Sequence, residues 1–369
     1  MRNFKTWVEI SKKAVEHNYK TFRSILATRT QLWSVVKSNA YGHGLTAFSQ
    51  LASQLGVDGF CVDSVAEGIK LRSVGIKKPI LVLGPTFAPF LKLAADNSLI
   101  ITISNWDLLK NLAKAKIRPA IHLKVDSGMH RQGFYNSELA EVARFIKENK
   151  IDLIGVYTHF ASAKDLNYPT YTENQFEEFQ KSIKILGKFG FTKLKKHASA
   201  TGGVLVNPKY HLDMVRIGIG LYGLWPSKEF MMQKSGLKLK PALSWHTVIS
   251  EVKNLKAGDF VGYDLVERVS KSTRMAILPI GYWHGFPRSL SGIGEVLING
   301  KKAKVLGRVS MDLVVIDADN IHCKVGDKAT IIGRQKGEEL AAFDVAQKMN
   351  TIHYELITRI NPLIERIVT

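Results

Sequence analysis

LWSVVKSNAYGHG, the stretch from Leu32 to Gly44, decides the fold of this chain. A short apolar run that ends in two valines is typical of a buried strand. Lys37 follows this run, so we expect its amine at the carboxyl end of the strand, where burial lowers the pKa of a lysine. A partly neutral lysine can form a Schiff base with a carbonyl. A lone lysine in such a place more commonly extends its charged end into water. Other positions in the sequence must therefore decide whether Lys37 is a Schiff-base lysine.

The bulk composition predicts a protein with a large core. The chain has 369 residues, of which 45% are hydrophobic and 23% charged, so it is long enough for two domains or for a barrel with an appendage. No apolar run reaches the length of a membrane span, and residues 1–5 lack the apolar core of a signal peptide. The two cysteines, Cys61 and Cys323, have no metal-ligand spacing. We therefore expect a cytoplasmic protein with no metal and no membrane anchor.

The net charge is unusually positive. Lysine and arginine number 52 against 32 acidic residues, which gives +20. A surface that binds a polyanion is one explanation. However, the lysines are scattered, and no arginine-rich tract or patch with interleaved aromatic residues occurs. We interpret the charge as a solvated basic surface, which also draws anionic small molecules toward the protein, and we expect no nucleic-acid partner.

Strand-like and helix-like patterns alternate between residues 11 and 232. Eight apolar runs of strand length are separated by helical patterns such as Leu45–Leu55 and Tyr171–Phe189. Eight such units predict an α/β fold, a (β/α)8 TIM-type barrel. A doubly wound open sheet is disfavoured because no G-x-G-x-x-G follows the first strand. The eight runs are Leu32–Lys37, Gly59–Val62, Ile80–Leu83, Leu99–Ile103, Ala120–Val125, Leu153–Thr158, Leu194–His197 and Leu212–Arg216.

Residues 233–369 change to short alternating runs punctuated by Gly and Asp, which predict a mostly β C-terminal domain. A strand at Trp7–Ile10 precedes the barrel, and we expect residues 1–10 to join this second domain. A helix at Ala341–Met349 and a strand at Tyr354–Arg359 are expected to close the chain. The other strand-like runs are Leu243–Lys253, Met275–Ile280, Gly294–Ile298, Lys302–Val309, Leu313–Asp317 and Lys328–Ile332.

Polar residues follow several of the predicted barrel strands, at the end where barrel active sites are built. Thr201 is expected to open a helix and to offer its hydroxyl and free backbone N–H groups to an anion. Gly218 allows a close backbone approach, and barrels often bind phosphate with the loops after strands seven and eight, where both residues lie. A site on one face is therefore expected. Its segments are Lys37, Lys124–Arg131, Thr158–Phe160, His197–Thr201 and Arg216–Gly220.

The segment VVKSNAYGHG resembles the pyridoxal 5′-phosphate (PLP) lysine segment of the alanine racemase family, which usually reads VVKADAYGHG. Similar segments follow over essentially the whole chain. The resemblance implies that Lys37 carries PLP, that Tyr41 contacts its phosphate and that His159 stacks on its ring. It also implies that Arg216, in MVRIGIGLYG, hydrogen-bonds the pyridine nitrogen. The other implied phosphate contacts are Thr201, Gly218, Ile219 and Tyr354.

The same resemblance implies how a substrate is held. Lys124 matches a lysine that is commonly carbamylated, and the carbamate orients Arg131 toward the phenolic oxygen of the cofactor and the substrate carboxylate. Met311 and Asp312 lie in a segment similar to one that holds the substrate carboxylate. Tyr282 lies in a segment similar to one that lines the substrate entrance.

Racemisation needs one base on each face of the substrate α-carbon, with PLP as the electron sink. Lys37 is expected to serve one face and Tyr263 the other. Tyr263 lies on the domain after the barrel, so the resemblance implies a head-to-tail homodimer with two shared active sites. Tyrosine is poorly basic at pH 7, and we expect Arg131 and a charged His197 to lower its pKa. Arg216 cannot give up its proton, so the pyridine nitrogen stays unprotonated, which discourages transamination.

Three segments depart from the usual form of the family, and one of them is VKSNAYGHG in place of VKADAYGHG. HxANSA becomes His197-Ala-Ser-Ala200-Thr201, and GYADG becomes Gly281-Tyr-Trp283-His284-Gly285. These changes are expected to alter the entrance or the substrate range without removing either base. We therefore expect an enzyme, an alanine racemase that supplies D-alanine for peptidoglycan. The alternatives are a racemase of serine, of basic amino acids or of a broader range, a barrel decarboxylase, and a catalytically silent PLP-binding or anion-binding protein.

Overall fold

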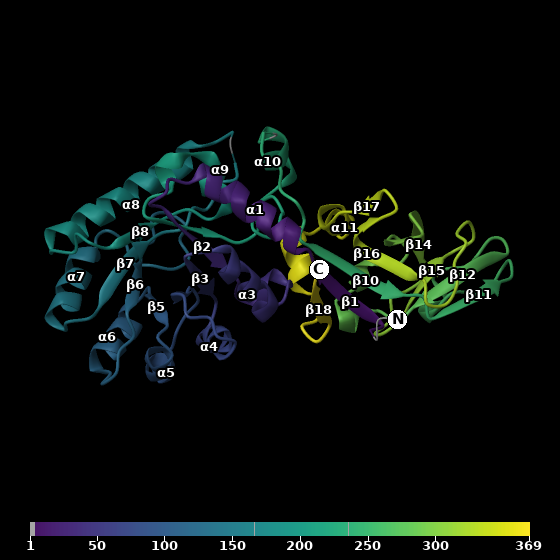
Figure 1. Ribbon diagram of the computed structural model, residues 1–369, viewed down its shortest axis with the longest axis horizontal. Helices are drawn as coiled ribbons and strands as arrows, with labels where there is room; N and C mark the ends of the chain where they lie inside the picture. Colours follow the sequence, from purple (N-terminus) through teal and green to yellow (C-terminus); the bar gives the residue numbers. More distant parts are fainter. Residues whose placement is uncertain (1–3, 166, 235) are drawn as a thin grey trace. The chain divides into compact units, whose positions relative to one another are not determined.

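The computed structural model describes residues 4–165, 167–234 and 236–369, and the chain divides into two compact units (Figure 1). The first unit contains residues 14–40 and 45–240. The second contains residues 1–13, 41–44 and 241–369. The second unit is therefore discontinuous in sequence, because segments near both chain ends and the short segment 41–44 belong to it.

The first unit is built on eight parallel strands in the part of the chain that the structure describes, in the order β8-β7-β6-β5-β4-β3-β2-β9. The backbone N–H of Asp213, just before β9, donates to the carbonyl of Lys196 in β8 over 3.1 Å, which joins the two ends of the sheet. The predicted fold class, a (β/α)8 barrel followed by a β domain, is confirmed. The strands are β2 (Gln31–Val35), β3 (Gly59–Val62), β4 (Ile80–Val82), β5 (Ile100–Ile103), β6 (Ile121–Lys124), β7 (Leu153–Tyr157), β8 (Lys195–His197) and β9 (Met214–Ile217).

Amphipathic helices cover the outside of this sheet, as Figure 1 shows for α4 to α8. In α7 the buried residues Leu139, Val142, Ala143 and Ile146 recur at the helical spacing of three and four, so one stripe faces the strands. The helices are α1 (Lys12–Ile25), α3 (Leu45–Leu55), α4 (Val65–Ser73), α5 (Leu91–Asp96), α6 (Trp106–Lys114), α7 (Leu139–Glu148), α8 (Thr170–Lys188), α9 (Thr201–Val206) and α10 (Lys228–Gln233).

Two strand glycines make room for large rings inside the barrel. A Cβ on Gly59 would lie 2.5 Å from the ring of Trp33, and a Cβ on Gly155 would lie 2.6 Å from the ring of His122. Glycine in a strand often marks such a close approach. The rings of Trp33 and His122 are 6.4 Å apart and both residues are buried. A histidine therefore lies within the packed interior of the barrel.

The second unit is a mostly antiparallel sheet in the order β11-β12-β15-β14-β13-β16-β10-β1-β18, with β17 on β16. Strand β1 pairs antiparallel with β10 and parallel with β18, so the two ends of the chain lie side by side. The strands are β1 (Thr6–Ile10), β10 (Leu243–Val248), β11 (Glu251–Leu255), β12 (Thr273–Leu278), β13 (Glu295–Ile298), β14 (Lys301–Leu306), β15 (Val314–Asp317), β16 (Lys328–Gln335), β17 (Glu338–Leu340) and β18 (Glu365–Val368), and the helices are α11 (Ala342–Lys348) and α12 (His353–Thr358).

Two predictions for the second unit are wrong. The strand expected at Tyr354–Arg359 is the helix α12, because Leu356, Ile357 and Ile360 are buried at helical spacing. The single run expected at Leu243–Lys253 is two strands: β10 pairs with β16, whereas β11 pairs with β12.

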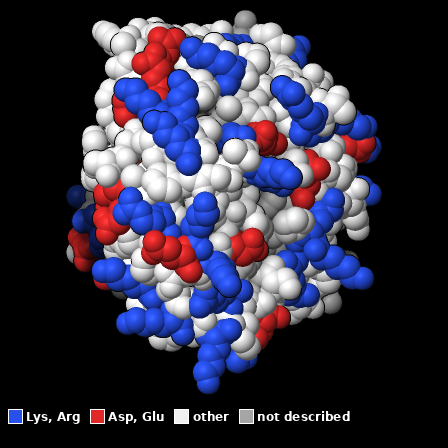
Figure 2. All heavy atoms as spheres, turned by 90° about the vertical axis from the view of Figure 1, so that its left-hand side faces the viewer, with Lys and Arg blue, Asp and Glu red and all other residues white. Residues whose placement is uncertain are grey.

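The basic residues do not form one continuous tract on the face that Figure 2 shows. Lys and Arg side chains are spread over this face, with Asp and Glu side chains between them. On this face the basic side chains are thus dispersed among acidic ones.

Candidate active site

Lys37 lies two residues after the end of β2 and precedes a short left-handed turn. The backbone φ angles of Ser38, Asn39, Ala40 and Tyr41 are 55°, 56°, 52° and 50°, a region that residues other than glycine seldom occupy. We call Ser38–Tyr41 the left-handed turn. Such residues cost about 1–3 kcal/mol each and persist only where the surroundings fix them, which is common at functional sites.

Several hydrogen bonds hold the left-handed turn. The Ser38 N–H donates to the Glu67 carboxylate over 2.7 Å, and the Asn39 side-chain oxygen accepts the Leu45 N–H over 2.8 Å. The Ala40 N–H donates to the Val36 carbonyl over 2.8 Å. Glu67 also accepts the Asp63 N–H over 2.7 Å. The sequence analysis missed Glu67, because a helix-surface glutamate carries no signal of this role.

The Lys37 amine is accessible and lies near one carboxylate. Its Nζ is 3.8 Å from Oδ1 of Asp63, and 37% of the Lys37 side chain is exposed. The side chain leaves the carboxyl end of β2, as predicted for a group that must reach a ligand.

Lys124, at the end of β6, has very different surroundings. It is buried, and its Nζ lies 4.7 Å from the centre of the Tyr157 ring. Burial, followed by the positive charges of Arg216 and Arg131, lowers the pKa of Lys124 to about 7, although the Asp126 carboxylate acts in the opposite direction. A large part of this amine is therefore neutral and nucleophilic near pH 7.

Arg216, in β9, is a buried cation whose hydrogen-bond acceptors among the described residues are uncharged. It is 2% exposed and donates from Nη2 to the backbone carbonyls of Thr158 and Ala198, each over 2.9 Å. Its Nη1 donates to Nδ1 of His197, and Nη2 lies 3.3 Å from Nδ1 of His159. No carboxylate forms an ion pair with Arg216 among the described residues. A buried cation without a counter-charge is costly, so this guanidinium suits a ligand that accepts a hydrogen bond.

The two site histidines are neutral near pH 7. Burial and then the charge of Arg216 hold the pKa values of both His159 and His197 well below the usual range. The expectation of a charged His197 is therefore wrong: its Nδ1 accepts a hydrogen bond from a permanent cation. Its ring also stacks on Tyr157, with centroids 4.7 Å apart and planes 6° apart.

The segments after β8 and β9 meet at Thr201, which begins α9 as predicted. The Thr201 hydroxyl accepts the Gly220 N–H over 3.2 Å. Gly218 and Ile219, just before it, are buried. A Cβ on Gly220 would lie 2.4 Å from the Phe22 ring, so only glycine permits this close approach.

The loop after β6 is shaped by Asp126, which the sequence analysis quoted without a role. Its carboxylate accepts the backbone N–H groups of Gly128, His130 and Arg131, each over 3.0 Å. Burial alone raises the pKa of Asp126, but these three hydrogen bonds outweigh it, so the pKa is lowered. The ionised carboxylate thus fixes the backbone of Arg131, whose side chain is exposed.

Several predicted site residues belong to the second unit. The rings of Tyr41 and Tyr354 are 6.1 Å apart, and burial raises the pKa of Tyr354 well above the usual range. Tyr263, in contrast, is 68% exposed. Tyr282 and Met311 are also exposed, at 43% and 54%, and lie in adjacent segments. The Tyr282 N–H donates to the Ser310 carbonyl over 3.1 Å.

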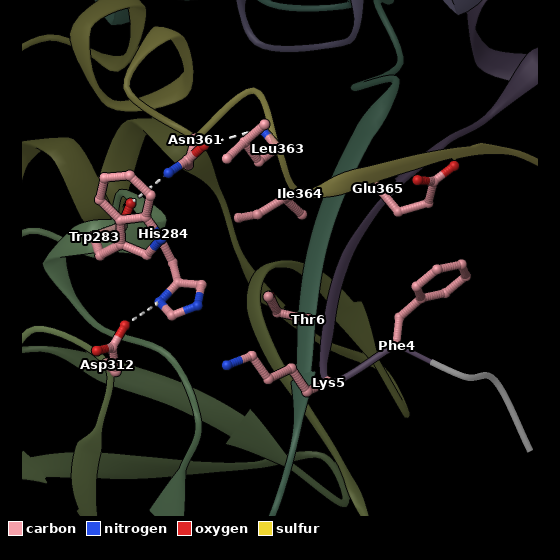
Figure 3. Close-up of a pocket in the computed structure, with 10 residues that line it drawn as sticks. All are labelled: Phe4, Lys5, Thr6, Trp283, His284, Asp312, Asn361, Leu363, Ile364 and Glu365. Atoms are coloured by element: carbon pink, nitrogen blue, oxygen red, sulfur yellow. Dashed lines mark hydrogen bonds and ion pairs between the residues drawn. The ribbon is translucent and has the colours of Figure 1, made fainter.

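Asp312 lies in a pocket of about 410 Å³ in the second unit (Figure 3). Its Oδ1 is 3.9 Å from Nδ1 of His284, and that nitrogen accepts the Gly281 N–H over 3.2 Å. Trp283 and His284, the two unusual residues of GYWHG, therefore help to line this pocket. The lining residues are Phe4, Lys5, Thr6, Trp283, His284, Asp312, Asn361, Leu363, Ile364 and Glu365.

Fold and side chains together define a barrel enzyme. A lysine, a buried arginine and two neutral histidines lie at the carboxyl ends of barrel strands, where barrels carry out their chemistry. Comparison with known proteins identifies the family. The family model "Alanine racemase, N-terminal domain" matches residues 10–226, and "Alanine racemase, C-terminal domain" matches residues 242–368. The chain belongs to the alanine racemase family, whose members are amino-acid isomerases.

Relatives of the chain are similar over nearly their whole length. The alanine racemase of Leptospira interrogans is 36% identical over 99% of this chain and 96% of the relative. The alanine racemase of Listeria monocytogenes is 39% identical over 98% of this chain and 97% of the relative. The crystal structure of alanine racemase from Bacillus anthracis with bound L-Ala-P has a TM-score of 0.95 and 34% identity, and the match covers 99% of this chain and 95% of that one. In the described residues, no helix is long and apolar enough to cross a membrane.

Proposed function

We propose that this chain uses PLP to interconvert L-alanine and D-alanine by a two-base mechanism. The observation that carries the proposal is Arg216, a buried guanidinium whose hydrogen-bond acceptors among the described residues are neutral, in the same barrel as a strand-end lysine. When bound, PLP supplies an electron sink for the charge that develops at the substrate α-carbon. The residues of the chain bind the cofactor, orient the substrate and move the protons.

Lys37 holds the cofactor covalently through its amine and, once released by substrate, moves a proton at one face of the α-carbon. Its accessible Nζ at the end of β2 supports this role. Tyr263 from a second copy of the chain moves a proton at the opposite face. Its 68% exposure in the second unit supports a role that only another chain completes.

Arg216 determines which reaction follows. Burial lowers the pKa of its guanidinium, but an arginine in a protein keeps its proton. It therefore donates a hydrogen bond to the pyridine nitrogen without transferring the proton. A cofactor nitrogen held by Arg216 would stay unprotonated, which would limit the charge drawn into its ring and favour return of the proton to the substrate α-carbon. This favours racemisation over transamination.

Lys124 and Arg131 prepare the substrate side of the site. A neutral buried amine reacts with carbon dioxide, and the pKa of Lys124 near 7 supports its carbamylation. The resulting carbamate carries a negative charge that orients Arg131. Arg131 and Met311 hold the substrate carboxylate, while Tyr282 and Asp312 support the entrance.

The remaining residues hold the cofactor in place. His159 stacks on its ring, and its neutral state supports that contact. The phosphate is bound by hydroxyl groups and backbone N–H groups near Thr201, and by the paired tyrosines Tyr41 and Tyr354. The residues proposed for the phosphate are Tyr41, Thr201, Gly218, Ile219 and Tyr354.

The active enzyme is a head-to-tail homodimer in the cytoplasm that supplies D-alanine for peptidoglycan. Exposed apolar side chains support an interface on the second unit, since large exposed apolar residues commonly mark contacts between chains. Tyr263, Leu265, Tyr282 and Met311 are each more than 40% exposed.

Reaction in heavy water tests the proposal. The loaded enzyme, incubated separately with L-alanine and D-alanine, should exchange the α-hydrogen for deuterium and abolish the optical rotation without releasing carbon dioxide. Lys37→Ala is the control and should do neither. Gas release would indicate a decarboxylase, and the absence of exchange would indicate a silent binding protein. If the α-hydrogen of serine or of a basic amino acid exchanged faster than that of alanine, that amino acid would be the preferred substrate.

A further inference from the structure

We infer that His122 is a positioning residue for Arg216, and that it acts through His197. The inference rests on the proposed function, in which Arg216 donates to the cofactor. It adds a residue from the barrel interior that touches neither cofactor nor substrate in that scheme. The inference is based on a continuous chain of hydrogen bonds that runs from Arg216 through His197 to His122.

The direction of these hydrogen bonds is fixed by the first donor. A guanidinium only donates, so Nδ1 of His197 accepts from Arg216. The single proton of the neutral His197 ring must then lie on Nε2. Nε2 of His197 is 2.8 Å from Nδ1 of His122, so His197 donates and His122 accepts. His122 in turn carries its own proton on Nε2.

Both rings remain neutral, so this chain of hydrogen bonds does not conduct protons near pH 7. Burial, followed by the charges of Lys195 and Arg216, lowers the pKa of His122 to about 3. Burial and Arg216 lower the pKa of His197 in the same way. The two imidazoles therefore act as oriented dipoles, each fixed in one tautomer.

The packing around His122 is built for this ring. His122 is 1% exposed, and Gly155 on the neighbouring strand leaves the space that the ring fills. His197 is held on one face by the parallel ring of Tyr157, whose hydroxyl bonds Thr102 over 2.9 Å. With both nitrogens bonded and one face stacked, the His197 ring has a single favourable orientation.

Loss of the His122 acceptor has a specific consequence. The Nε2–H of His197 becomes a buried donor without a partner, which the ring can relieve by turning or by changing tautomer. Either change removes the acceptor of Arg216 Nη1. The guanidinium then loses one of the contacts that aim it, and the partition between racemisation and transamination shifts.

Nitrogen NMR on the protein without cofactor tests the geometry directly. With 15N-labelled histidine, the wild type should show His197 protonated on Nε2, and a scalar coupling should join this nitrogen to Nδ1 of His122 across the hydrogen bond. A proton on Nδ1 of His197, or no coupling, would overturn the inference. This result does not depend on catalysis, so a chain that fails to racemise alanine but shows the coupling contradicts only the proposed function.

Two variants of similar size separate positioning from packing. The oxygen of Asn can accept where Nδ1 of His122 accepts, whereas Leu cannot. We expect His122→Leu to lower kcat about tenfold with KM for alanine little changed, the scale typical of outer-shell partners. Transamination per turnover should rise in parallel.

His122→Asn is the matched control and should keep both the His197 tautomer and the wild-type partition. Melting temperatures report on folding in each variant. An equal fall in kcat for Leu and Asn, with an unchanged partition between the two reactions, would overturn the positioning role and leave His122 as a core residue.

Discussion

At the residue scale, the two lysines at strand ends differ in what surrounds them. Lys37 is 37% exposed beside the Asp63 carboxylate, whereas Lys124 is buried against Tyr157 with two arginines nearby. An amine that is partly neutral near pH 7 attacks a carbonyl readily, so Lys124 competes chemically with Lys37. Carbamylation of Lys124 removes that competition, because a carbamate nitrogen is not a nucleophile.

Lys37→Ala should abolish the visible absorbance of covalently held PLP, since no other accessible amine replaces Lys37 at the end of β2. Absorbance spectra of the purified variant after incubation with PLP provide the measurement. Lys70→Ala, an exposed lysine of α4, is the control and should keep the wild-type spectrum. Visible absorbance that persists in Lys37→Ala but disappears in the double variant with Lys124→Met would show that the cofactor is held by Lys124.

Lys124→Met should stabilise the protein in a pH-dependent way. Lys124 has a pKa of about 7 when the protein is folded, against an ordinary value of 10.5 for a lysine in water. Between these values the unfolded chain holds one more proton, so the free energy of unfolding of the wild type rises with pH through this window. The advantage of Lys124→Met, up to about 5 kcal/mol, should be greatest below pH 7 and should fade toward pH 10.5. Urea unfolding in buffers free of carbon dioxide measures the difference in free energy of unfolding between the variant and the wild type. A difference that is constant with pH would show that Lys124 is not a neutral amine in the folded protein.

The sequence identifies the residues with a distinctive segment around them and misses those without one. Lys37 and Arg216 lie in long motifs, so their places at strand ends could be predicted. His122 lies two residues before Lys124, which puts both side chains on the same face of β6. That spacing is the one available signal, and it is weak because many strands contain a histidine. The neutral state of His197 depends on burial beside Arg216, which only the folded chain reveals.

At the element scale, most boundaries are predicted to within one or two residues, because parallel strands are continuous apolar runs and helices repeat every three to four residues. The exceptions have local causes. The sequence of α12, HYELIT, favours a strand in the prediction because it contains β-branched and aromatic residues. The left-handed turn is unpredictable, since Ser38, Asn39 and Ala40 stand where glycine is expected.

Ser38 offers a direct test of the left-handed turn, because its side chain is exposed. Ser38→Gly should raise the free energy of unfolding by about 0.5–1 kcal/mol, since glycine adopts a φ of 55° without strain. Ser38→Val should lower it by about 1–2 kcal/mol, because a β-branched residue fits this conformation poorly. Urea unfolding followed by circular dichroism measures both. Equal stabilities of the two variants would mean that the turn is not left-handed in solution.

At the scale of the whole molecule, eight β/α units and a β-rich remainder were enough to predict the two kinds of architecture. The arrangement of chains is a different kind of property. A sequence describes one chain, and the second base of the proposed mechanism lies in a unit that follows the barrel. If a second chain covers Tyr263 and Met311, as proposed, the single chain shows them only as exposed residues, and single exposed apolar residues are common in any protein.

Mixing two inactive variants decides whether the active site is shared. If Lys37 and Tyr263 come from different chains, a dimer of Lys37→Ala with Tyr263→Phe contains one site with both changes and one site with neither. Random pairing gives half mixed dimers, each with one intact site of two, so the mixture should recover about a quarter of the wild-type activity. Subunits are exchanged by mild unfolding and refolding together, and each variant refolded alone is the control. If both bases came from one chain, every site in the mixture would carry a change, and the mixed sample would be no more active than the mean of its parents.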